Sequence, residues 1–252
     1  MRIRTSRLLG LALLAALVFA PVHAAHATLT LPGGDTLLNG AFDDLGYGAT
    51  GNAYVTPYLY VGDLASTDSP SAQAAVTLLT YGYAIAGLGT ANAKITYSFT
   101  NDDVSPFSDL RFIANIQPDG SGSFNDMVSE VWGAPVAGDP DERQLADFFD
   151  DLNVQIATND GLDGSDTCGG SCDADVALQW NLASLGAGAT WQIVLSLADD
   201  GSAISGRRLV VTSVDTTGTQ LTLSGTAMLV PEPSLVVLSG LAGLALARRR
   251  RP

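Results

Sequence analysis

The chain has 252 residues, with twelve basic and twenty-six acidic side chains, and a formal net charge of −14 at pH 7. Residues 28–229, called the body below, hold five of the basic and twenty-five of the acidic side chains, a net charge of −20. Such a charge argues against nucleic acids and anionic membrane surfaces as partners. It is compatible with a hydrated matrix or with cations such as Ca²⁺.

Residues 1–27 have the pattern of an export signal. Three arginines precede an apolar run at 8–20, and an Ala-His-Ala motif at 25–27 fits the small-x-small cleavage rule. We therefore expect export through the Sec machinery and cleavage after Ala27, so that the mature chain starts at Thr28. Cleavage after Ala24 is the alternative.

Both histidines, His23 and His26, lie in this signal. The expected mature chain therefore has no histidine. This excludes Ser-His-Asp and Cys-His catalysis and histidine-ligated zinc.

The body is rich in strand patterns. Residues 93–100 and 110–116 alternate, with apolar and polar side chains on opposite faces. Pro57 indicates an edge strand or a bulge, and the Gln-Pro-Asp-Gly sequence at 117–120 predicts a turn. Further strands are expected at 28–31, 53–61, 74–86, 127–132, 176–182, 190–197, 209–214 and 220–229.

One short helix is expected in the body, over residues 141–152. Asp139 would cap it and Pro140 would take its first position. Its apolar side chains recur at i, i+3, i+4 and i+7 and would share one face. They are Leu145, Phe148, Phe149 and Leu152.

These elements predict an all-β fold, a single β-sandwich with one short helix over 28–229. The signal helix at 1–27 and a hydrophobic helix within 230–252 would flank it. The segments AKITYSFTND at 93–102 and WNLASLGAGATWQIVLSL at 180–197 resemble Ig-like sandwich modules of bacterial surface proteins. This resemblance implies an Ig-like or jelly-roll-like sandwich.

The loop at 159–175 contains the only two cysteines, Cys168 and Cys172. In an oxidising compartment we expect them to form a local disulfide. Five aspartates in the same loop suggest a Ca²⁺ site, with a solvated acidic turn as the alternative. They are Asp160, Asp163, Asp166, Asp173 and Asp175.

The tail at 230–252 has three parts. Pro231, Glu232 and Pro233 form a stiff extended triplet, and residues 235–247 are apolar or small. Four basic residues follow: Arg248, Arg249, Arg250 and Arg251. The apolar run is about 20 Å long as a helix, short for a membrane span, which suits a transient anchor. The arginines would stay cytoplasmic, with the body outside.

This tail resembles the PEP-CTERM sorting signal of bacterial exported proteins. The resemblance implies recognition by an exosortase, a membrane protease-transpeptidase that cuts near the triplet, and an extracellular polysaccharide matrix. The protein would be anchored transiently in the inner membrane and then reach the cell envelope or the extracellular space.

Two classes of function remain open. The first is a non-enzymatic exported surface or extracellular-matrix protein. The second is a secreted carbohydrate-active protein. As a glycoside hydrolase it would need two carboxylates, and Glu130 beside Trp132 is the first place to look, since Glu142 is the body's only other glutamate. As a carbohydrate-binding module it would need an exposed aromatic platform. The candidates are Tyr54, Tyr58, Tyr60, Trp132, Trp180 and Trp191.

Overall fold

A computed structural model describes residues 41–47, 51–62, 79–120, 126–147, 152, 156, 161–168, 172–199, 204–214 and 220–230. The signal at 1–27, the expected start at Thr28, the strand at 28–31 and the tail from residue 231 lie outside the described residues. Within them, no helix is long and apolar enough to cross a membrane.

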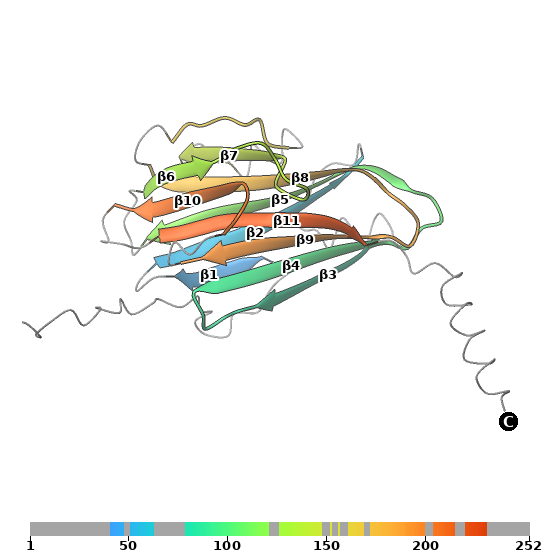
Figure 1. The fold of residues 1–252 in the computed structure, drawn as a ribbon, viewed down its shortest axis with the longest axis horizontal. Helices are drawn as coiled ribbons and strands as arrows, with labels where there is room; N and C mark the ends of the chain where they lie inside the picture. The colour runs from blue at the N-terminus through green and yellow to red at the C-terminus, as the bar shows by residue number, and fades with distance from the viewer. Residues whose placement is uncertain are drawn as a thin grey trace, which may run out of the picture.

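The described chain forms two antiparallel sheets (Figure 1). The first sheet has the order β1-β2-β5-β8-β7 and the second the order β3-β4-β9-β11-β10-β6. The prediction of an all-β, sandwich-like body is confirmed at this level. In chain order the strands are β1 Phe42–Tyr47, β2 Gly51–Val61, β3 Leu79–Ala86, β4 Asn92–Asn101, β5 Phe107–Gly120, β6 Asp126–Val131, β7 Glu142–Asp147, β8 Ala174–Leu185, β9 Thr190–Ala198, β10 Arg208–Ser213 and β11 Gln220–Val230.

One core fills the space between the sheets, because strands of both sheets alternate apolar residues toward it. Its centre is aromatic. The Phe112 ring of the first sheet lies 4.7 Å from Tyr97 and 5.7 Å from Phe99 of the second. Trp180 and Trp191 continue this cluster, each 6.0 Å from a phenylalanine ring. A smaller outer cluster lies on the far face of the first sheet, where Tyr58, Tyr60, Ile113, Ala146, Leu152, Ile156, Leu162 and Ala177 are buried.

The helix predicted at 141–152 is wrong over residues 142–147, which form β7. This strand pairs with β8, Leu145 opposite Val176, and its side chains enter both clusters. Pairing with a neighbouring strand therefore overrides the local helical pattern. Asp139 does not cap a helix; it accepts a hydrogen bond from the Val136 N–H at 3.0 Å. Phe148 and Phe149 lie outside the described residues.

The turn predicted at 117–120 is also wrong, since β5 continues to Gly120 in register with β2. Two prolines lie where a strand has a single described neighbour. β1 pairs with β2 only as far as Val55, before Pro57. β8 pairs with β5 only as far as Ile116, before Pro118. Proline has no N–H to donate, so it is tolerated at such positions. Pro57 is therefore at an edge only locally, in a strand that has a neighbour on both sides before Pro57.

Gly225 of β11 lies directly against the Trp180 indole of the first sheet. A Cβ atom there would lie 2.6 Å from Trp180 Cζ2 and 2.7 Å from the Val194 carbonyl oxygen. The indole and the backbone leave no room for a side chain, so glycine permits the Trp180 packing.

We predict that Gly225→Ala lowers the free energy of unfolding by about 1–3 kcal/mol, because the added methyl group overpacks the core. Urea denaturation measures the change. Gly186→Ala is the matched control, since a Cβ there meets nothing within 4 Å, and it should change stability by less than about 0.5 kcal/mol. Equal effects of the two substitutions would contradict the close approach.

Candidate functional site

Glu130, the first catalytic candidate, is held by an arginine. Arg143 of β7 donates to both carboxylate oxygens, from Nε at 2.5 Å and from Nη2 at 3.2 Å. The pair connects β6 of the second sheet to β7 of the first. The partner of Glu130 is thus a cation, not the second carboxylate that glycoside hydrolysis requires.

Trp132 lies against Arg143 of this ion pair and against a second arginine, Arg207. The guanidinium carbons of Arg207 and Arg143 lie 4.9 Å and 6.0 Å from its ring centre. Arg207 also donates to the carbonyl oxygens of Gly133, at 3.1 Å, and Pro140, at 2.9 Å. These arginines therefore fix the connection between β6 and β7.

The cysteine-containing loop also joins the sheets. Cys168 and Cys172 form a disulfide, as expected, and both are buried against the main core. Cys172 exchanges backbone hydrogen bonds of 2.7 and 3.0 Å with Asp126 of β6. Leu145 of β7 bonds to the backbone of residues 165 and 167. The loop thus closes one side of the sandwich.

The aspartates of this loop serve separate roles. Asp163 accepts a hydrogen bond from the Ser165 N–H at 2.8 Å, and hydrogen bonds to Ser165 lower the pKa of its carboxyl. Asp166 accepts from the Cys168 N–H at 3.1 Å, while Asp173 and Asp175 are buried near the start of β8. In the described part of the loop, which omits Asp160, no group of three or more His, Cys, Asp or Glu residues is arranged to hold a metal.

We predict that reduction of the disulfide costs about 2 kcal/mol of stability or less, because the loop that it closes is short. The free energy of unfolding would be measured by urea denaturation with and without dithiothreitol. The C168A/C172A variant should not respond to the reductant. A wild-type protein that unfolds on reduction would contradict a local role.

The proposed aromatic platform does not form. Tyr58, Tyr60, Trp180 and Trp191 are each at most 3% exposed. They are core residues of the two clusters. Tyr54 and Trp132 are half-buried. Tyr54 lies on β2 of the first sheet, whereas Trp132 directly follows β6 of the second.

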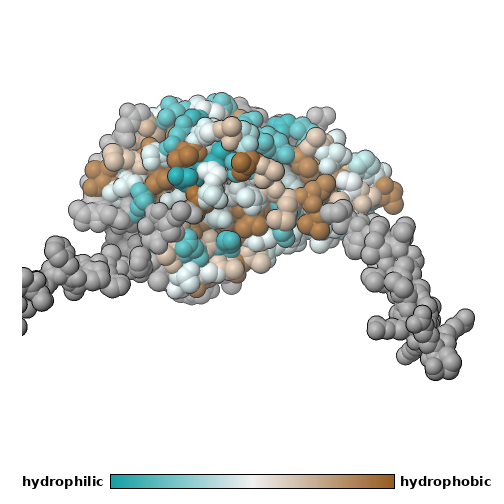
Figure 2. All heavy atoms as spheres, viewed as in Figure 1, coloured by the Kyte–Doolittle hydropathy of each residue, from teal (hydrophilic) through white to brown (hydrophobic). Residues whose placement is uncertain are grey.

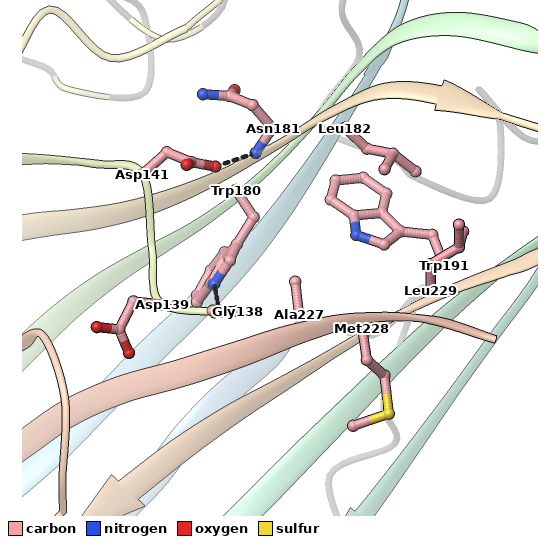
Figure 3. A pocket seen from close by; sticks show the side chains of 10 residues that line it. All are labelled: Gly138, Asp139, Asp141, Trp180, Asn181, Leu182, Trp191, Ala227, Met228 and Leu229. Carbon is pink, nitrogen blue, oxygen red and sulfur yellow. Dashed lines mark hydrogen bonds between the residues drawn. The ribbon is translucent and has the colours of Figure 1, made fainter. Parts of the chain in front are cut away.

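A small hollow of about 210 Å³ opens beside Trp180 and Trp191 (Figure 3). Its polar atoms are largely engaged: Trp180 Nε1 donates to Gly138 O at 3.2 Å, and the Asn181 N–H donates to Asp141 at 2.6 Å. Met228 and Leu229 at its edge are about half exposed. The hollow is therefore a small gap of mixed polar and apolar lining at the margin of the core.

A larger groove of about 450 Å³, the outer groove, lies where the outer cluster ends on the first sheet. It collects polar side chains from β5, β7 and β8. Of these side chains, only Glu142 is a candidate that the sequence identifies. The outer groove is lined by Asp109, Arg111, Glu142, Gly161, Leu162, Gln179, Asn181, Leu182 and Ala183.

A chain of amides fixes one wall of the outer groove. The Leu162 N–H donates to Gln179 Oε1 at 2.8 Å, and Gln179 Nε2 donates to Asn181 Oδ1 at 2.8 Å. The Asn181 side chain in turn hydrogen-bonds the Glu142 carboxylate. Because Gln179 is only 3% exposed, this order of donors and acceptors is held from inside the protein.

The two carboxylates of the outer groove have opposite electrostatic environments. Arg111 donates to both oxygens of Asp109, at 2.8 and 3.4 Å, and these hydrogen bonds lower the pKa of Asp109. Burial and the nearby Asp141 raise the pKa of Glu142, an effect that Arg111 and Asn181 partly offset. The outer groove thus holds one stabilised and one destabilised anion.

We predict opposite stability changes for Glu142→Gln and Asp109→Asn at neutral pH. Ionised Glu142 disfavours the folded state, so Gln should raise the melting temperature, and the gain should vanish as acid protonates Glu142. Ionised Asp109 favours the folded state, so Asn should lower it, and the loss should vanish on acidification through the lowered pKa. Each change is at most about 1 kcal/mol, because Asp109 is exposed and Glu142 only half-buried. Thermal unfolding followed by circular dichroism across pH measures both shifts, and shifts of equal sign would contradict this assignment.

No known protein family, curated protein or solved structure that was compared with this chain matches it. The function must therefore be argued from the chain's own residues.

Proposed function

We propose that this protein is a non-enzymatic exported surface or extracellular-matrix protein, sorted by a PEP-CTERM and exosortase system. The observation that carries the proposal is the tail: the triplet Pro231-Glu232-Pro233, the apolar run 235–247 and four arginines. The export signal at 1–27 supports it. Exosortase and the Sec machinery are the implied partners.

The place where the sandwich ends supports this arrangement. β11 runs to Val230, immediately before the triplet. All residues of the described apolar core lie in or before β11, so removal of the tail takes none of them away. Cleavage near the triplet would therefore leave the body intact. The protein would be anchored transiently in the inner membrane and then reach the cell envelope or the exterior.

An Ig-like or jelly-roll-like sandwich is the finer fold that we propose. The two antiparallel sheets support it, and so does the placement of both resembling segments. Residues 93–102 lie mostly in β4, and 180–197 run from β8 through a short turn into β9. β4 and β9 are direct neighbours in the second sheet.

The carboxylates support a non-enzymatic role. Glu130 and Asp109 each have both oxygens engaged by an arginine, so both carboxylates are held in ion pairs. Exposed apolar residues are scattered among polar ones on the face shown in Figure 2.

A secreted carbohydrate-active protein is the second candidate. One observation favours it: Glu142 and Asp109 share the outer groove, and their pKa values are shifted in opposite directions, as in acid-base pairs. The arginine on Asp109 argues for binding without hydrolysis.

We predict that the protein from its native host, analysed by intact mass, begins near Thr28 and ends between Pro231 and Ser234. The P231A/E232A/P233A variant should keep residues 235–252, because the recognition triplet is lost. Pro135→Ala, at an exposed proline of the body, is the matched control and should be processed normally. A wild-type protein that retains its tail in these cells would refute the sorting proposal.

A further inference from the structure

We propose that the outer groove binds a neutral saccharide, and that it is the surface through which the protein contacts a polysaccharide matrix. This inference rests on the proposed matrix function and names the class of its ligand. It is carried by the juxtaposition of Asp109, Arg111, Glu142 and Asn181 in one groove.

The outer groove is a built feature of the first sheet. Tyr60, Arg111 and Asn181 are successive partners across β2, β5 and β8. Over Tyr60 the sheet is covered, since Tyr60 Oη donates to Ile156 O at 2.7 Å and the ring is buried. Leu162, the last residue of the outer cluster in this segment, lines the outer groove, and the nearby Asn181 is exposed.

The donors and acceptors match neighbouring hydroxyl groups. Asp109 and Glu142 offer carboxylate oxygens, Arg111 offers guanidinium N–H groups, and Asn181 offers an amide. A sugar hydroxyl both donates and accepts, so two adjacent hydroxyls can bridge such a mixed set. The amide chain from Gln179 sets these groups before a ligand arrives, which lowers the entropy cost of binding.

The charges of the outer groove select against ions. Asp109 and Glu142, with Asp141 close to Glu142, outnumber Arg111, so an anionic polysaccharide would be repelled. A cation would have to approach Arg111, whose guanidinium binds Asp109 and also acts electrostatically on Glu142. A neutral ligand rich in hydroxyls avoids both penalties.

Asp109 has a left-handed backbone conformation within β5. Its φ of 53° lies in a region that most residues other than glycine avoid and that aspartate adopts occasionally. Its neighbours Ser108 and Leu110 remain paired with β8, so the deviation is confined to this residue. Its carbonyl accepts the Gly62 N–H at 3.0 Å while its carboxylate meets Arg111.

The apolar lining completes the fit. Leu162, Leu182 and Ala183 offer a surface for the C–H face of a sugar ring. The volume of about 450 Å³ is within the usual range for small-ligand sites.

Affinity electrophoresis tests the proposal with the full chain in native gels that contain dextran, a soluble β-glucan, galactomannan or alginate. We expect retardation by at least one neutral polysaccharide and none by alginate. Arg111→Ala should weaken binding by about tenfold or more. The matched control Arg208→Ala, on β10 of the other sheet, should bind as wild type. Glu142→Gln preserves shape and should also weaken binding, which guards against misfolding of the arginine variant.

The absence of retardation in all three neutral gels would overturn the proposal. Retardation by alginate alone, or binding unchanged in both groove variants, would also overturn it. Correct tail processing without retardation would refute the outer groove and leave the sorting proposal standing. Retardation by a neutral polysaccharide together with an uncleaved tail would support the outer groove and refute the sorting proposal. Release of reducing ends from a retarding polysaccharide would support the saccharide site and contradict the non-enzymatic role.

Discussion

The aromatic contact between the two sheets is the interaction on which the rest of the structure depends. Phe112 of the first sheet packs against Tyr97 and Phe99 of the second, and Trp180 extends the cluster toward Gly225. Large rings buried in this way dominate the apolar area removed from water. They also fix the relative position of the sheets, while the opposite face of the first sheet, at β5, β7 and β8, forms the outer groove.

The side of the sandwich at β6 and β7 is closed by a different kind of interaction. Arg143 pairs with Glu130 across the sheets, Arg207 caps nearby carbonyls, and the disulfide loop bonds to both strands. With few cations available in so acidic a body, most serve as ties inside the molecule. The features that looked catalytic in the sequence are thus explained by the need to join two sheet edges.

Local pattern predicted the fold where a strand is amphipathic. Alternation at 93–100 and 110–116 corresponds to β4 and to the centre of β5. It failed at Leu145, whose helical spacing was overridden by pairing with Val176, and at Pro118, which a locally unpaired side of β5 accommodates. The outer groove could not be predicted, because Arg111 and Asn181 are seventy positions apart and meet only through strand register. Glu142 and the Cys168–Cys172 pair could be named as candidates from the sequence because of their residue types alone.

The position of Val230 has a mechanical consequence. It is the last residue of β11 and pairs with Thr190; β9 pairs with β11 from Thr222 to Val230, whereas β10 pairs only with residues 220–224. A force that pulls on the chain beyond Val230 acts along the axis of β11. The hydrogen bonds that join residues 222–230 to β9 are then loaded in shear, so they must break together and not one after another. A body held by such an end resists extraction of its terminal strand, and the force passes through β11 into β9 at the centre of the second sheet.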